Sequence, residues 1–190
     1  MADKPIYDIG VIHGRFQVLH NDHLKYLMAG RILCRHLLVG ITNPDPMQTK
    51  KEAADPKRSD PSANPLTYYE RYMMVKTVLI QAGVHPEAFS IVPLPINLPQ
   101  RYQYYVPLDA VFFLTIYDQW GRRKKQYFES LGLTTHLLWE VPPGQKGISA
   151  ADIRRRIRTG RPWEHLVPKC VPPLIEQWRI AERLKSLQKD

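Results

Sequence analysis

Cysteine is scarce in this 190-residue sequence, and long apolar runs are missing from it. With only Cys34 and Cys170, neither a disulfide framework nor a four-cysteine zinc site can form. No apolar run approaches the roughly 18 residues that a membrane span needs. The first ten residues also lack the apolar core of a secretory signal. We therefore expect a cytoplasmic protein with no membrane partner.

The overall composition is that of a folded, basic protein. Hydrophobic residues make up 44% of the chain, which excludes disorder over its whole length, and we expect a single domain over 1–190. The formal net charge is +9, and nine of the basic residues lie in two clusters, at 122–125 and 154–161. This charge favours anionic partners such as nucleotides, other phosphates or nucleic acid.

Apolar segments of strand and helix type alternate along the chain. Strands are predicted at 7–13, 37–42, 90–94, 110–116 and 135–140, and helices at 21–35, 67–81, 120–131, 149–159 and 173–187. Asn21 or Asp22 is a candidate cap for the first helix. This order predicts an α/β protein, with a Rossmann-like doubly wound parallel sheet and a helical C-terminal segment over 149–190.

The segment 43–65 interrupts the alternation. It holds five prolines, four basic and four acidic residues, and almost no apolar side chains. A loop of this length is either a mobile lid over a site or a disordered surface insertion, and the sequence leaves both open.

The first motif with chemical content comes directly after the first strand, where α/β folds bind their ligands. It reads GRFQVLHNDH from Gly14 to His23. Glycine lets the backbone approach a phosphate, and the start of the next helix offers free N–H groups. His20 and His23 are three residues apart, so both imidazoles can face one side. They can donate to phosphate oxygens or bind a metal, although no third metal ligand is evident nearby.

A second motif, GISAADIR, begins at Gly147. Ser149 and Asp152 have the spacing of a capping box, which predicts a helix start at this point. Arg154 lies one turn into that helix, where it can meet a phosphate held at the helix N-terminus.

Together, in this order, the two motifs resemble those of the nucleotidyltransferase superfamily, and most closely the archaeal-type nicotinamide-nucleotide adenylyltransferases. Asn-Pro-Leu-Thr at 64–67, Glu70-Arg71 and the stretch 163–169 add to the resemblance, which spans nearly the whole chain. It implies transfer of AMP from ATP to a mononucleotide acceptor, nicotinamide or nicotinate mononucleotide, with Mg²⁺ and release of pyrophosphate. It also implies that no covalent intermediate forms, in keeping with phosphoryl transfer by positioning and charge stabilisation.

The resemblance further implies roles for individual residues. His20, His23 and Arg154 would be catalytic, holding the triphosphate and stabilising its charge. The remaining ATP-binding residues would be Gly14, Arg15, Phe16, Gln17, Ile148 and Ser149. Asp22 stands where the family has glycine, and this difference supports an alternative with CTP or with another phosphate acceptor.

The second-substrate site is the least determined part of the pattern, because 114–117 replaces the family's Ser-Gly-Asn-Pro. Tyr117, Asp118 and Trp120 come after a predicted strand and so lie at the ligand-binding edge of the sheet. Tyr117 or Trp120 could stack on a pyridine ring, and Asp118 could bind ribose hydroxyls or help to hold Mg²⁺.

Two weaker alternatives come from other functional classes. The basic clusters suit a nucleic-acid-binding protein, but no recognised nucleic-acid-binding motif accompanies them. Asp22 and Ala151 allow an inactive nucleotide sensor. The C-terminal apolar residues, among them Leu174 and Trp178, serve either a homo-oligomer interface or only the core.

Overall fold

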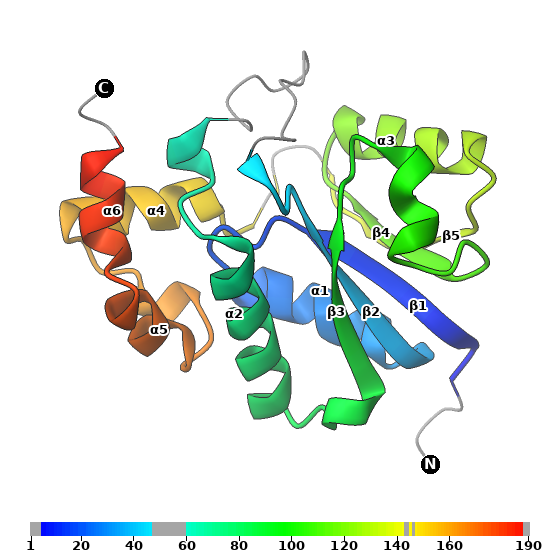
Figure 1. Cartoon of the computed structure of the whole chain (residues 1–190), viewed down its shortest axis with the longest axis horizontal. Coiled ribbons are helices and arrows are strands. Elements are labelled where there is room, and N and C mark those ends of the chain that lie inside the picture. The colour runs from blue at the N-terminus through cyan, green and yellow to red at the C-terminus, as the bar shows by residue number, and fades with distance from the viewer. Residues whose placement is uncertain (1–4, 47–59, 143–144, 146, 188–190) are drawn as a thin grey trace.

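The computed structural model describes residues 5–46, 60–142, 145 and 147–187. Its centre is a five-stranded parallel sheet in the order β3-β2-β1-β4-β5, which confirms the predicted Rossmann-like α/β fold (Figure 1). The strands are β1 (Tyr7–Gly14), β2 (Cys34–Thr42), β3 (Phe89–Leu94), β4 (Val111–Ile116) and β5 (Thr135–Glu140). The chain runs outward from β1 to β3 and then returns to the other side of β1. A crevice for ligands is therefore expected where β1 and β4 end side by side.

Helices cover both faces of the sheet. They are α1 (Asn21–Arg31), α2 (Tyr68–Gln81), α3 (Gln119–Ser130), α4 (Ala150–Thr159), α5 (Val171–Gln177) and α6 (Ile180–Ser186). One core joins a face of the sheet to α1, α2 and the C-terminal helices, while α3 and the 3₁₀ helix η5 (Pro99–Tyr104) close the other face. Figure 1 shows α4, α5 and α6 together at one end of the molecule and α3 at the other.

The first helix is shorter than predicted, and its cap is a different residue. It ends at Arg31 instead of continuing to Arg35, because Cys34 already pairs with Tyr7 in the parallel ladder. His20 occupies the cap position, so Asn21 and Asp22 lie inside the first turn. Pairing with the central strand thus overrides the local helical pattern.

The predicted C-terminal helix 173–187 is in fact two helices. The chain breaks at Arg179, which adopts a left-handed backbone conformation with φ of 52°. Ile175 and Ile180, on either side of the break, are buried in the core of this chain. Leu174 and Trp178 pack against the same core, so these four apolar residues have a role within the chain itself.

Most of the Pro-rich segment 43–65 lies outside the described residues. The two alternatives predicted for it, a mobile lid and a disordered insertion, therefore concern residues that the structure does not describe. Its last part forms a short 3₁₀ helix, η3 (Pro61–Ala63), with Asp60 accepting a hydrogen bond from Ser62 N at its start. Among the residues that the structure describes, no helix is long and apolar enough to cross a membrane.

Candidate active site

The loop between β1 and α1 is held in place by its own side chains. Phe16 has a φ of 51°, in the left-handed region, and its buried ring packs 5.2 Å from the ring of His23. Gln17 is also buried, and its amide forms two 2.9 Å hydrogen bonds with the main chain of Leu66. The buried side chains of Phe16 and Gln17 therefore support the loop.

The two histidines lie together at the start of α1. The rings of His20 and His23 are stacked with centroids 3.7 Å apart, and His20 N donates to His23 Nδ1 at 3.3 Å. Burial lowers the pKa of His20 to about 4, against an opposing effect of Asp22. Burial, followed by His20 and Arg15, holds the pKa of His23 well below its usual value. Both imidazoles are therefore neutral at pH 7, in a form that can donate an N–H without carrying a charge.

Positive charge collects around this pair. Arg154, on α4, donates from Nη1 to the carbonyl oxygen of Gln17, which brings the second motif onto the first. Burial and then the charge of Arg15 lower the pKa of Arg154 to about 10, so it stays protonated at pH 7. The same Arg15 lowers the pKa of His23. Neighbouring cations repel one another, and a polyanion bound among them relieves that repulsion.

The second motif meets the first through Asp22. Its Oδ2 accepts a hydrogen bond from Ile148 N at 2.6 Å, just before α4 begins. Ser149 is exposed and occupies the N-cap position of α4, but its side chain makes no capping bond. The predicted capping box with Asp152 is therefore wrong, because that carboxylate is instead bound by Arg155 and Arg156 of the same helix.

A cavity of about 290 Å³ opens beyond the ends of β4 and β5. Two of the three predicted second-substrate residues, Tyr117 and Asp118, line it, whereas Trp120 does not. Its other lining residues are Ile116, Gln119, Arg122, Glu140 and Val141. Asp118 also caps α3 by accepting from Gly121 N at 3.0 Å, and Tyr117 accepts from Trp139 Nε1 at 3.2 Å. Trp120 instead has the Lys124 ammonium 4.9 Å from its ring centre.

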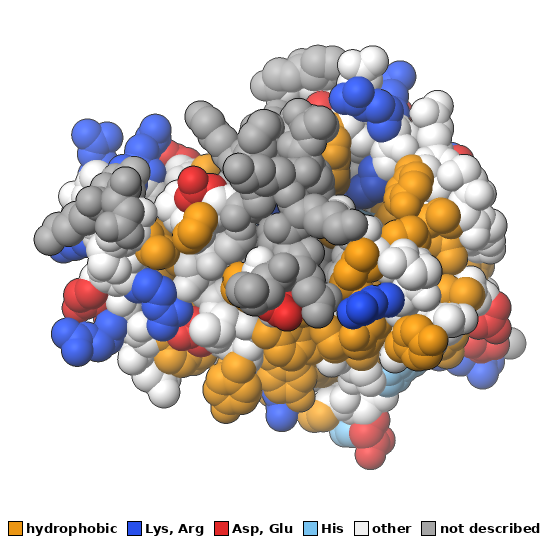
Figure 2. Space-filling view, turned by 45° about the horizontal axis from the view of Figure 1, so that its top comes forward, with side chains coloured by type: hydrophobic (Ala, Val, Ile, Leu, Met, Phe, Trp, Pro, Cys, Tyr) orange, Lys and Arg blue, Asp and Glu red, His pale blue; other side chains and the backbone are white. Residues whose placement is uncertain are grey.

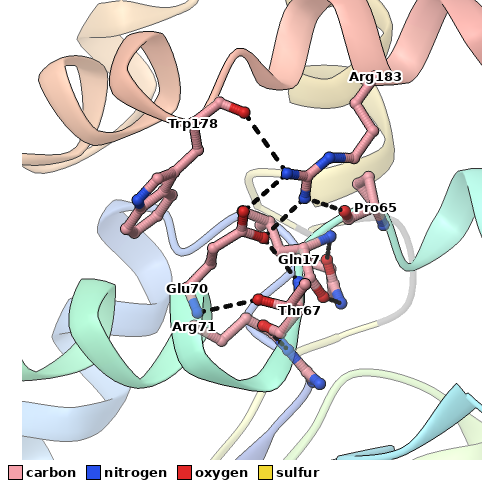
Figure 3. A network of polar contacts seen from close by, with 8 residues as sticks. Gln17, Pro65, Thr67, Glu70, Arg71, Trp178 and Arg183 are labelled. Atoms are coloured by element: carbon pink, nitrogen blue, oxygen red, sulfur yellow. Dashed lines mark hydrogen bonds and ion pairs between the residues drawn. The ribbon is translucent and has the colours of Figure 1, made fainter.

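Arg71 belongs to a sequence motif, but the motif alone assigns it no role. It is 2% exposed, and its guanidinium donates to the carbonyl oxygens of Arg15, Thr42 and Asn43, at 3.1, 2.7 and 2.8 Å. Arg71 therefore ties together the turns after β1 and β2. Its neighbour Glu70 forms a two-pronged ion pair with Arg183 of α6, and Figure 3 shows both residues in one network.

His13 was missed by sequence reasoning, although a polar residue at the end of an apolar strand is a visible signal. Its side chain is buried, and neither ring nitrogen has a hydrogen-bond partner within the described part of the chain. The ring packs 5.3 Å from the ring of Phe128. Burial and then Lys124 keep its pKa well below the usual value, so His13 is neutral.

The described residues contain no group of three histidine, cysteine, aspartate or glutamate side chains that could hold a metal ion. Figure 2, in which the top of Figure 1 is turned toward the viewer, shows Lys and Arg side chains on the left and on the right of the molecule. Neutral imidazoles, guanidinium groups and helix N-termini are suited to phosphate oxygens.

Known proteins resemble this chain over nearly its full length. It is 48% identical over 186 residues to a phosphonoformate cytidylyltransferase of Streptomyces viridochromogenes, covering 98% of this chain and 100% of the relative. It is 32% identical over 183 residues to a nicotinamide-nucleotide adenylyltransferase of Thermococcus onnurineus, covering 94% of this chain and 87% of the relative. A search of protein-family models gave no match.

A solved structure has the same fold. It is a bifunctional NMN adenylyltransferase/ADP ribose pyrophosphatase from Francisella tularensis, complexed with AMP and a manganese ion, with a TM-score of 0.63 and 16% sequence identity. The match covers 95% of this chain and 52% of that enzyme, so the chain spans about half of its length. These similarities confirm the resemblance found in the motifs: the chain belongs to the nucleotidyltransferases, in the family that includes phosphonoformate cytidylyltransferase and the archaeal nicotinamide-nucleotide adenylyltransferases.

Proposed function

We propose that this enzyme transfers CMP from CTP to phosphonoformate or a closely similar small phosphonate, with release of pyrophosphate. The observation that carries the proposal is the 48% identity to a phosphonoformate cytidylyltransferase over that protein's whole length. The expected adenylyl transfer to nicotinamide or nicotinate mononucleotide becomes the second candidate. It is supported by relatives of 32% identity and below.

The reaction needs charge stabilisation more than covalent help from the protein. An oxygen of the acceptor attacks the α-phosphorus of the nucleotide, a new P–O bond forms, and the bond to the bridging oxygen of the pyrophosphate breaks. That oxygen leaves with the electron pair. Arg15 and Arg154 would attract the triphosphate, and N–H groups of the His20–His23 pair would donate to it as negative charge accumulates.

The cavity beside β4 and β5 would hold the nucleoside part of the substrate. Asp118 and Glu140 provide carboxylate oxygens there, and Arg122, the one cation among the described lining residues, forms an ion pair with Glu140. Such a lining suits ribose hydroxyls and the amino group of cytosine. It would repel an acceptor that carries a carboxylate next to its phosphonate. Tyr117 and Asp118 are therefore reassigned in this proposal from the second substrate to the nucleoside.

Mg²⁺ would enter with the nucleotide. This ion prefers oxygen ligands and commonly takes several of them from substrate phosphates and water. The site's imidazole and guanidinium groups complement such a metal–triphosphate complex without coordinating the metal. When bound, Mg²⁺ would offset negative charge on the phosphates.

The test is pyrophosphate release by the purified protein with CTP or ATP, each combined with phosphonoformate, nicotinamide mononucleotide or nicotinate mononucleotide. We expect the highest kcat/KM with CTP and phosphonoformate, together with a new phosphorus signal for the cytidylylated product. Preference for ATP with either mononucleotide would establish the second candidate instead. Absence of turnover in every combination would refute both.

A further inference from the structure

Asp22 belongs to the first turn of α1, immediately before His23, yet its contact lies 126 residues away along the chain. Its Oδ2 accepts a short hydrogen bond from the main-chain N–H of Ile148, at 2.6 Å. A side-chain acceptor and a main-chain donor fix the position of the loop without depending on which side chain residue 148 carries.

Gly147, the residue before Ile148, leaves room for this contact because it has no side chain. A Cβ atom placed on Gly147 would overlap Asp22 Oδ2. The carboxylate therefore occupies the space that a side chain at 147 would need, and glycine permits the approach. The close contact of Asp22 with Gly147 and Ile148 therefore holds this loop against the start of α1.

This contact matters because the loop leads into α4, which carries Arg154. Ile148 and Ser149 run directly into α4, and α4 carries Arg154. Two other contacts lie nearby: Arg154 of α4 bonds to the carbonyl oxygen of Gln17, and Asn21 Nδ2 donates at 3.1 Å to the carbonyl oxygen of His165, which follows α4 in the chain. Among these three contacts, the one made by Asp22 holds the loop at the very start of α4.

From this geometry we infer that Asp22 is a positioning residue. It holds the loop 147–149 against α1 and thereby sets Arg154 at its working distance from His20 and His23. The catalytic consequence rests on the proposed function, whereas the loop contact does not.

The contact predicts an order among variants. Asp22→Asn keeps an oxygen that can accept from Ile148 N and loses only the charge. Asp22→Ala removes the acceptor, and Gly147→Ala disturbs the same contact from the other side. Asp109→Ala, at an exposed carboxylate before β4, is the matched control.

The first measurement is hydrogen–deuterium exchange of the peptide that contains Ile148, in the full-length protein without nucleotide. We expect exchange to become about tenfold faster or more in Asp22→Ala and Gly147→Ala, the scale set by loss of one charged hydrogen bond. Asp22→Asn and Asp109→Ala should stay within about threefold of wild type. Melting temperatures identify any variant that has failed to fold, and Gly147→Ala then replaces Asp22→Ala in the comparison.

The second measurement is steady-state kinetics with CTP and phosphonoformate. Misplacing Arg154 should raise KM for the nucleotide about tenfold or more in Asp22→Ala, with a smaller change in kcat, and Asp22→Asn should restore most of it. Calorimetric affinity for CTP and ATP replaces KM if the wild type transfers no nucleotide, so failure of the proposed function is recognised separately. Unchanged exchange in Asp22→Ala overturns the inference. Faster exchange in Asp22→Ala with unchanged nucleotide binding also overturns it. An Asp22→Asn variant that is as impaired as Asp22→Ala overturns it as well.

Discussion

Replacing Arg71 with methionine tests how the turns around the site are held. The guanidinium of Arg71 bonds to four carbonyl oxygens, those of Arg15, Thr42, Asn43 and Thr67. Burial lowers the pKa of Arg71 to about 10, so it is charged at pH 7 and these bonds are charge-assisted. Methionine has similar length and packs well, but it provides no donor.

Each lost hydrogen bond lowers the free energy of unfolding by an amount that depends on the burial of its carbonyl oxygen. Thr67 O keeps its partner, because Arg71 N also bonds to it within the helix. The bond to Thr42 O is buried, and an unsatisfied buried acceptor costs about 2 kcal/mol. The partly buried carbonyls of Arg15 and Asn43 can recover water, so we assign about 1 kcal/mol to each. Relief from burying the charge offsets about 1 kcal/mol, which leaves a net loss of about 3 kcal/mol.

Backbone strain adds to the importance of these bonds. Phe16, the residue after Arg15, and Asn43 both have left-handed φ values, of 51° and 49°. Such conformations cost a non-glycine residue about 1–2 kcal/mol and persist where surrounding contacts enforce them. Without the Arg71 bonds we expect the β1–α1 turn to relax, and KM for the nucleotide to rise in the variant even below its melting temperature.

The assay is thermal unfolding followed by circular dichroism, checked by urea titration. For a chain of about this size, 3 kcal/mol corresponds to a fall in Tm of about 6–12 °C. Lys76→Met is the matched control, because Lys76 is an exposed cation on the same helix, and it should shift Tm by less than about 2 °C. A fall in Arg71→Met no larger than that of the control would refute the reasoning.

Three further predictions concern the site. The pKa values of His13, His20 and His23 lie below their unfolded value of 6.5, so the unfolded chain binds protons that the native chain does not. The free energy of unfolding, measured by urea titration, should therefore fall from pH 7 toward pH 5, by at most about 1.4 kcal/mol per pH unit per histidine; a urea midpoint that does not change with pH contradicts this. His23→Ala should lower kcat roughly 10²–10³-fold at saturating substrates, and unchanged kcat would make the pair a bystander. Arg154→Ala should raise KM for the nucleotide more than it lowers kcat. Arg155→Ala, an exposed neighbour on α4, should leave both within about twofold, and equal effects of the two variants would contradict a role for Arg154.

The parts of the fold that could be predicted are those with local causes. The apolar run at 110–116 appears as β4 within one residue, because a short run of large apolar residues is stable as a strand buried on both faces. The position of the glycine–histidine motif also had a local cause, since it comes directly after a strand and before a helix. The ordered set of motifs along the chain indicated the family, and the comparisons with known proteins confirmed it.

The end of the first helix and the break in the C-terminal helix depend on contacts with residues far away in the sequence. Residues at 32–35 have apolar content that a helix would accept, but pairing with β1 makes Cys34 the start of a strand. The C-terminal helix is divided at Arg179, and Arg183 beyond the break pairs with Glu70, 113 residues away. Such long-range contacts decide between local alternatives that differ by little in free energy.

The sequence by itself determined the fold class and the family, and it predicted where a phosphate site lies, because each rests on local patterns and motifs. The tertiary structure decided what individual residues do. It buried Phe16 and Gln17 as supports of the loop, and it placed Asp22 on the loop before α4. It also made Arg71 the anchor of two turns. The physical reason is that a hydrogen bond forms between groups brought within about 3 Å of each other, and only the folded chain brings residues 22 and 148 that close.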